Sequence, residues 1–287
     1  MTGIQSWKVG SVQVTSIVEA ETAGVPPEFF FPAGSAADVA AQSWLVPTFA
    51  SPDGSLIFRV QAFVLDLGHR RLVVDPCVGN RKERSLPLWH MQNYTFLNDF
   101  VAAGFDLDSV NDVVHTHLHA DHVGWDTRLV EGAWTPTFRS ARYLYTQREL
   151  DHRRATDEDS SEDVYADSIA PIFEAGLADI VEEEVDLGDG LHLSPTTGHT
   201  PGHVSLWIES DGERAVLTGD LIHHPVQCAH PGWAEIADWD EELARDTRRL
   251  FLNKAATDHT LVFVAHFPTR PAGHIVADGG AWRFEPT

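Results

Sequence analysis

The chain has 287 residues, of which 43% are hydrophobic, so it is long and apolar enough to bury a substantial core. Its 43 acidic residues outnumber 20 basic ones, and a formal charge of −23 disfavours nucleic acid and anionic membranes as partners. Two cysteines are too few for a disulfide framework, and we find neither a secretion signal nor a run of about 18 apolar residues. We therefore predict a cytoplasmic protein.

In the first half of the chain, near-alternating apolar residues over 9–17 predict a half-buried strand. Residues 20–56 are rich in proline, glycine and aromatic side chains, which predicts an irregular N-terminal arm packed on an apolar surface. The remaining elements expected here are strands at 58–65, 71–74 and 112–114 and a helix at 94–103.

The second half alternates strands and helices in the same way. We expect strands at 143–145, 178–185, 190–193, 203–208, 214–217 and 261–265, and helices at 147–155, 161–176 and 240–256. Strands followed by helices, twice over, predict an α/β (α+β) protein in which two sheets form a sandwich with outer helices. We predict one domain over residues 1–287.

Four histidines and one aspartate lie within the eight residues that follow the 112–114 strand: His115, His117, His119, Asp121 and His122. Imidazole and carboxylate are preferred ligands of zinc and similar metals. His117 and His119 can bind one ion, and Asp121 and His122 can face a second ion nearby. The alternative is an ordinary surface or core role for each histidine, with adventitious metal binding.

Three further segments carry metal-ligand types where strands meet loops, a common location for active sites. They contain His199 in a glycine- and proline-rich loop, Asp220 after an apolar strand, and His266 after another. Independent ligand-bearing segments favour a binuclear metal site. Two adjacent divalent cations would supply a bridging hydroxide as nucleophile and polarise the substrate, which makes Asp121 and Asp220 catalytic residues as well as ligands.

At these residues the chain resembles the metallo-β-lactamase superfamily, whose His-x-His-x-Asp-His signature matches residues 117–122. Asp75, which precedes the signature, and His199, Asp220 and His266, which follow it, match the family's other motifs in chain order, over about 12–267. The resemblance implies a four-layer αβ/βα sandwich. It implies that His117, His119 and His199 bind the first metal, that Asp121, His122 and His266 bind the second, and that Asp220 bridges both.

A bridging aspartate departs from true β-lactamases of the superfamily and resembles its lactonase, thioester-hydrolase and phosphotriester-hydrolase branches. We therefore favour hydrolysis of a carboxylic ester or lactone, with acyl-homoserine lactones first. The cofactors would be two divalent ions, zinc first, with manganese, cobalt or iron as alternatives. A homodimer is expected by analogy only.

Other activities of the superfamily stay open as alternatives. An aryl ester or phosphotriester hydrolase needs the same ligands. A glyoxalase II type thioester hydrolase would be expected to show basic residues for an anionic carrier, and the sequence has no clear cluster of them. A mono-iron persulfide dioxygenase would leave the second metal position unused.

His223 is a further catalytic candidate. Acyl-homoserine lactonases of the family have a tyrosine three residues after the corresponding aspartate, and this chain has His223 there, followed by His224. A histidine can donate the proton to a leaving group because its pKa is near neutrality. The alternative is that these histidines only hydrogen-bond the neighbouring loop. Asp75 and His115 are candidates to support the ligands from outside the metal site, with a strand-end turn role as the alternative for Asp75.

The resemblance would bring several aromatic, histidine and methionine side chains near the metal site, as candidate walls of an apolar substrate pocket, with ordinary core packing as the alternative. They are Trp89, His90, Met91, Trp125, Trp134, Trp233 and His274.

Overall fold

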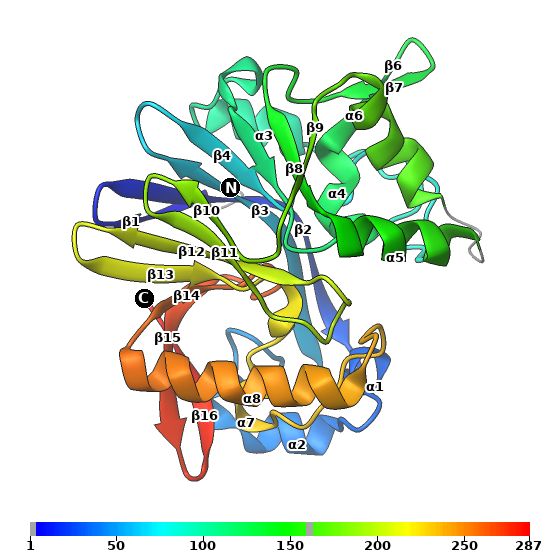
Figure 1. Cartoon of the computed structure of the whole chain (residues 1–287). Helices are drawn as coiled ribbons and strands as arrows, with labels where there is room; N and C mark the ends of the chain where they lie inside the picture. The colour runs from blue at the N-terminus through cyan, green and yellow to red at the C-terminus, as the bar shows by residue number, and fades with distance from the viewer. Residues whose placement is uncertain (1–3, 159–162) are drawn as a thin grey trace. The chain divides into compact units, whose positions relative to one another are not determined.

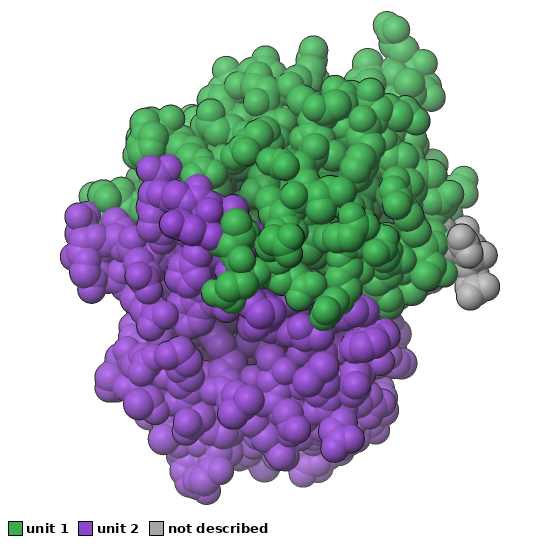
Figure 2. Space-filling view, viewed as in Figure 1, with its two compact units in different colours: residues 1–20, 60–185 green, residues 21–59, 186–287 purple. Residues whose placement is uncertain are grey.

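The computed structural model describes residues 4–158 and 163–287 (Figure 1). The described strands form two seven-stranded sheets and a separate two-stranded sheet, so the protein has the mixed α/β content predicted. The chain divides into two compact units, residues 1–20 with 60–185 and residues 21–59 with 186–287 (Figure 2). Strands β2 (Val12–Val25) and β3 (Leu56–Asp66) each continue across the unit boundary. We keep one domain over 1–287 as a prediction for that reason.

The sheet of unit 1 has the order β1-β2-β3-β4-β5-β8-β9. Its other strands are β1 (Gln5–Val9), β4 (Arg71–Val74), β5 (Asp112–Val114), β8 (Arg142–Thr146) and β9 (Ala178–Val181). The four strands β4, β5, β8 and β9 run parallel. Parallel strands are covered on both faces, which explains the β-branched run at Asp112–Val114. The single strand predicted at 9–17 is corrected, because a turn with Gly10 at φ +57° separates β1 from β2.

Helices and turns connect these strands. They are α3 (Phe96–Ala102), η2 (Leu107–Ser109), α4 (Ala120–Val123), η3 (Gly124–Asp126), α5 (Gln147–Glu158), the π-helical η4 (Tyr165–Ile169) and α6 (Ala170–Glu174). Strands β6 (Thr127–Val130) and β7 (Ala133–Pro136) form an additional hairpin that the sequence did not predict. The helix predicted at 161–176 corresponds to η4 and α6, while its residues 161 and 162 lie outside the described residues.

Unit 2 contains the second sheet, with the order β10-β11-β12-β13-β14-β15-β16. Its strands are β10 (Val185–Gly188), β11 (Leu191–Pro195), β12 (Val204–Ser210), β13 (Glu213–Leu217), β14 (Leu261–Phe263), β15 (Ala272–Asp278) and β16 (Ala281–Pro286). Strands β13 and β14 pair in parallel, and β14-β15-β16 is an antiparallel meander. Helix α7 (Val226–Ala229) contacts β16, and α8 (Glu241–Asp258) contacts β15.

Helix α8 shows how the sequence sets the ends of an element. The Asp240 side chain accepts a hydrogen bond from the backbone N–H of Leu243, which caps the first turn. At the other end, His259 adopts a left-handed conformation with φ +51° and terminates the helix. Among the described residues no helix is both long and apolar enough to cross a membrane.

The segment predicted as an N-terminal arm, residues 20–56, is less irregular than expected, and from Glu21 onward it belongs to unit 2. It starts as the end of β2 and contains α1 (Pro27–Phe30), α2 (Ala36–Ala41) and η1 (Ser43–Leu45). The ring of Phe49 is fully buried, with its centroid 6.2 Å from that of Phe267 and 6.0 Å from that of Phe284. The arm's aromatic residues therefore help to form the core of unit 2.

Candidate metal centre

Unit 1 brings four of the predicted ligands together at the carboxyl end of β5. His117 and His119 lie on the loop after β5, and Asp121 and His122 lie on α4. Nε2 of His117 is 3.1 Å from Nδ1 of His119, and the rings of His117 and His122 have centroids 4.0 Å apart. Nε2 of His122 is 3.7 Å from a carboxylate oxygen of Asp121. The side chains of His117, Asp121 and His122 are nearly fully buried.

Asp75 supports this group from the end of β4. Its carboxylate accepts hydrogen bonds from the backbone N–H and the hydroxyl of Thr116, at 2.8 and 2.7 Å. Oδ2 of Asp75 is also 3.1 Å from Nδ1 of His122. If His122 binds a metal, a carboxylate beside its second nitrogen would help to orient the ring, so the supporting role of Asp75 stays a prediction.

His115 has a different role from the one predicted. Its Nε2 is 2.9 Å from the Asp126 carboxylate, and its Nδ1 is 3.0 Å from the carbonyl oxygen of Leu144. Burial opposes the charged imidazole, but Asp126 more than offsets it, and the pKa of His115 is raised. The ring also stacks on Tyr145, with centroids 4.6 Å apart. His115 and Asp126 therefore form a buried pair within the core of unit 1, which the signature's spacing did not reveal.

Unit 2 brings the other three predicted ligands together. His199 lies in the loop between β11 and β12, Asp220 lies in the short helix η5 (Gly219–Leu221) after β13, and His266 follows β14. One carboxylate oxygen of Asp220 is 3.6 Å from Nε2 of His199, and the other is 3.1 Å from Nε2 of His266. The backbone N–H of Asp220 donates to Nε2 of His203 at 3.1 Å, which holds η5 against the histidine loop.

Asp238 supports His199 and was missed in the sequence. Nδ1 of His199 donates to Oδ1 of Asp238 at 2.9 Å, while Arg248 lies 3.5 Å from Oδ2. Burial works against the charge of Asp238, but the hydrogen bond and the charge of His199 outweigh it and lower the pKa of Asp238 to about 2. Asp238 lies in a loop without a motif, 39 residues from its partner, so local sequence carried no signal for it.

The structure separates the roles of His223 and His224. Nε2 of His223 is 3.2 Å from the Asp220 carboxylate, so this ring faces the ligands of unit 2. The ring of His224 points away from them: Nε2 donates to the carbonyl of Phe49 at 2.8 Å, and Nδ1 accepts from the backbone N–H of Val226 at 3.1 Å. Burial lowers the pKa of His224 to about 4, so it is a neutral structural histidine.

Glu235 is a second residue that the sequence analysis missed. Its carboxylate and the ring nitrogens of His199 and His223 all lie within 4.8 Å of one another. Glu235 is buried, and this burial raises its pKa. It accepts a hydrogen bond from the backbone N–H of Ala237, so the turn at 235–238 presents both Glu235 and Asp238 to the histidines.

Several candidate pocket walls are packing residues. Trp125 stacks on Phe96 with ring centroids 5.6 Å apart, and Trp134 lies under the ammonium group of Lys82, 4.1 Å from it. Trp233 stacks on His230 at 4.4 Å. Nδ1 of His274 is 3.2 Å from the carbonyl oxygen of Thr260. Of the remaining three, His90 bonds the backbone of Arg84, Trp89 packs against the core, and Met91 is exposed.

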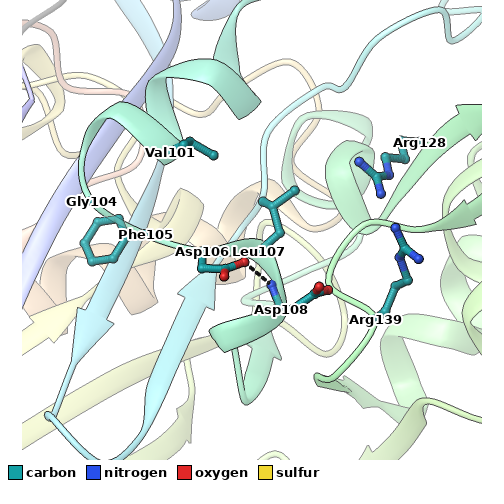
Figure 3. Close-up of a pocket in the computed structure, with 8 residues that line it drawn as sticks. All are labelled: Val101, Gly104, Phe105, Asp106, Leu107, Asp108, Arg128 and Arg139. Carbon is teal, nitrogen blue, oxygen red and sulfur yellow. Dashed lines mark hydrogen bonds between the residues drawn. The ribbon is translucent and has the colours of Figure 1, made fainter.

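A surface hollow of about 450 Å³ lies elsewhere on unit 1 (Figure 3). It is lined by Val101, Gly104, Phe105, Asp106, Leu107, Asp108, Arg128 and Arg139. None of these is a predicted ligand or catalytic residue, so this hollow is separate from the candidate metal centre.

The donor atoms in each unit fit a zinc-type cation. Atoms that share one tetrahedral zinc at about 2.0–2.1 Å are about 3.3–3.4 Å apart. In unit 1 the His117 to His119 and Asp121 to His122 separations are 3.1 and 3.7 Å. In unit 2 the separations from Asp220 to His199 and His266 are 3.6 and 3.1 Å. Nitrogen and carboxylate donors at these distances suit zinc and its neighbours among the transition metals.

Comparison with known proteins identifies the family of this chain. A model of the metallo-beta-lactamase superfamily matches residues 57–266, and the chain therefore belongs to this superfamily and has its fold. An N-acyl homoserine lactonase from a Bacillus species is 26% identical over 172 residues, and one from Bacillus thuringiensis is 29% identical over 171. The alignments cover 59% of this chain and 61% of each relative, so the chain spans about three fifths of the relatives' length.

Two solved structures resemble the whole chain. The hydrolase AbOPH of the beta-lactamase superfamily has a TM-score of 0.83 at 22% identity, covering 100% of this chain and 98% of the other. AidC, a dizinc quorum-quenching lactonase solved with its product N-hexanoyl-L-homoserine, has a TM-score of 0.81 at 20% identity, covering 99% and 97%. At these identities the likeness establishes the fold.

Proposed function

We propose that this protein is a binuclear metal-dependent hydrolase of carboxylic esters or lactones, with acyl-homoserine lactones as the favoured substrates. The observation that carries this proposal is the pair of buried ligand groups, four residues in unit 1 and three in unit 2. Membership of the superfamily supports a metal-dependent reaction, and the lactonase relatives support the substrate class.

We propose that the two groups act on the same pair of ions. His117, His119 and His199 would hold the first, Asp121, His122 and His266 would hold the second, and Asp220 would contact both. Two divalent ions, zinc first, would supply an activated water and polarise the oxygen of the scissile group. The dizinc lactonase AidC, which shares the fold, supports two ions.

His223 is our proposed proton donor to the leaving alkoxide. Its Nε2 lies 3.2 Å from the carboxylate of Asp220, which orients the ring beside the ligands. An imidazole can act as a general acid of this kind. Asp121 and Asp220 would contribute by holding the ions and by offsetting part of their positive charge.

The partner in this proposal is a small-molecule ester or lactone. The formal charge of −23 argues against nucleic acid and anionic membranes. Cys77 and Cys228 are both buried free thiols, which suits the reducing cytoplasm that we propose as the compartment. A homodimer is part of the proposal by analogy with the family only.

The test uses protein purified without chelators. Its metals are counted by mass spectrometry, and the same sample is assayed against a homoserine lactone, an aryl ester and a phosphotriester. Asp220→Asn removes a ligand charge, and Asp211→Asn in the exposed turn between β12 and β13 is the matched control. We expect two metal equivalents and lactone turnover that Asp220→Asn abolishes and Asp211→Asn retains.

Each other outcome changes the proposal in a defined way. Faster turnover of the aryl ester or phosphotriester would move the protein to that branch of the family. A single iron per chain would instead indicate an oxygenase, and full metal loading without turnover of the three substrates would refute the proposed substrate class.

A further inference from the structure

The loop that follows β4 has an unusual backbone conformation. Asp75, Cys77 and Gly79 have φ values of +50°, +47° and +81°, so left-handed residues alternate with ordinary ones. Alternation of this kind turns successive backbone N–H groups toward one side, where they form a site for an anion. Two of the three residues have side chains, for which this conformation is costly, so other contacts must hold the loop.

One such contact is with the segment that follows the His-x-His-x-Asp-His signature. The backbone N–H of Gly124 donates to the carbonyl of Cys77 at 2.7 Å, and that of Trp125 donates to the carbonyl of Pro76 at 2.8 Å. A Cβ atom on Gly124 would lie 1.8 Å from the carbonyl oxygen of Val78. The two backbones are therefore in direct contact, and a shift of the loop would move the end of α4.

Glu19 of β2 supplies the acceptor oxygens for the N–H groups of this loop. Its carboxylate accepts hydrogen bonds from the backbone N–H groups of Val78, at 2.8 Å, and Gly79, at 3.1 Å. It also accepts a hydrogen bond from Nε1 of Trp125 at 2.6 Å. One side chain thus bonds both the loop at 75–79 and the segment after α4.

We infer that Glu19 is a positioning residue that holds Asp75, and through it His122, in place for metal binding. The chain of contacts runs from Glu19 to the loop at 75–79, then through Asp75 to Nδ1 of His122 at 3.1 Å. The consequence for metal binding rests on the proposed function, because it takes His122 to be a ligand. The hydrogen bonds from Glu19 to the loop at 75–79 and to Trp125, which we call the Glu19 clamp, do not depend on the proposed function.

The environment of Glu19 supports this role. Burial raises its pKa to about 8 in spite of the three N–H donors. Ionised or protonated, both carboxyl oxygens keep a lone pair for these donors, whereas an amide nitrogen cannot accept a hydrogen bond. Glu19→Gln therefore removes one acceptor with almost no change in size and tests the clamp in either protonation state.

The matched control is Glu21→Gln. Glu21 lies two residues further along β2, and its carboxylate pairs with Arg59 at an exposed position. Hydrogen exchange of residues 75–79 and 122–125 is measured in the metal-free proteins. Zinc affinity is then measured by chelator competition on the loaded proteins, and the cobalt forms are compared by visible absorption.

We expect Glu19→Gln to speed hydrogen exchange in both segments and to alter the cobalt spectrum. It should also raise the dissociation constant of the more weakly bound zinc about tenfold. Glu21→Gln should match the wild type in all three. If Glu19→Gln does not fold, Glu19→Asp is measured instead, since its shorter side chain cannot reach all three donors.

Unchanged exchange in both segments would overturn the clamp. Faster exchange with unchanged zinc affinity and cobalt spectrum would overturn the link to metal binding. If the wild type does not hydrolyse lactones, only the proposed substrate is refuted, because none of these three measurements depends on turnover.

Discussion

The ring of His199 is held by Asp238: Nδ1 donates to the buried carboxylate at 2.9 Å, which leaves Nε2 facing Asp220 at 3.6 Å. An outer carboxylate of this kind sets the tautomer of a ligating histidine and increases its basicity. Arg248 lies 3.5 Å from the same carboxylate and, with a side chain that is almost fully buried, helps to keep Asp238 charged.

We therefore expect Asp238→Asn to weaken zinc binding by about 10–100-fold. An amide can keep the shape of the side chain while it loses the charge that orients His199. Asp240→Asn is the control, because Asp240 caps α8 and asparagine caps helices equally well. Chelator competition at constant pH measures both variants, and equal affinity for Asp238→Asn and wild type would contradict this role.

His224 should make the protein less stable in acid. Its folded pKa of about 4 lies below the ordinary value of 6.5, so the unfolded chain takes up a proton that the folded ring excludes. The stabilising contribution is complete above pH 6.5 and is lost as the pH falls toward 4, amounting to roughly 3 kcal/mol. Urea unfolding of metal-free wild type and His224→Gln at pH 7.5 and 4.5 measures it. The wild type should lose more stability than the variant between these two values.

Asp167 neutralises two buried cations. Its carboxylate is 3.1 Å from Nζ of Lys82 and 2.7 Å from the guanidinium of Arg84, and both basic side chains are fully buried. Asp167→Asn would leave these charges without their counterion and should lower the free energy of unfolding by about 3–5 kcal/mol. Arg245→Gln breaks the exposed pair with Glu241 and should cost less than about 1 kcal/mol. Similar midpoints in urea for the two variants would show that the buried cluster is unimportant.

A side chain at the glycine before His199 should destabilise the protein more than one at an unhindered glycine. Gly198 has φ +142°, and a Cβ atom there would lie 2.4 Å from the Cα atom of Ala244 in α8. Gly212 also has a positive φ, of +82°, but a Cβ atom there meets nothing within 4 Å. Gly212→Ala should therefore cost only backbone strain, about 1 kcal/mol. Gly198→Ala should cost about 1–3 kcal/mol more through overpacking and should also weaken zinc binding, as thermal unfolding and chelator competition would reveal.

Much of the fold could be predicted because its elements have local signals. The hairpin of β3 and β4 and the helix α8 follow from apolar periodicity and from capping at residues such as Asp240. The seven proposed ligands could also be nominated from the sequence, because they lie where strands meet loops, the signature concentrates four of them in six residues, and the resemblance points to the same set. Within each unit the structure brings these residues to ligand distances.

What sequence could not reveal depends on contacts between distant segments. Asp238 bonds a histidine 39 residues away, and Glu19 bonds Trp125 across 106 residues, with no local pattern for either. His115 shares the signature's composition, yet its ring turns to Asp126 in the core. His223 and His224 are adjacent and chemically identical, so only the backbone path after Asp220 decides which of them faces the ligands.

Each unit contains one buried thiol whose labelling rate can report local unfolding. Cys77 lies in the loop held by Glu19 in unit 1, and Cys228 lies in α7 of unit 2, both inaccessible to solvent. Burial raises the pKa of the Cys228 thiol to about 12 and that of Cys77 well above its ordinary value, so neither reacts with an alkylating reagent from the closed state. The labelling rate of each thiol therefore reports how often its own surroundings open, so local unfolding of the two units can be timed separately in one native sample.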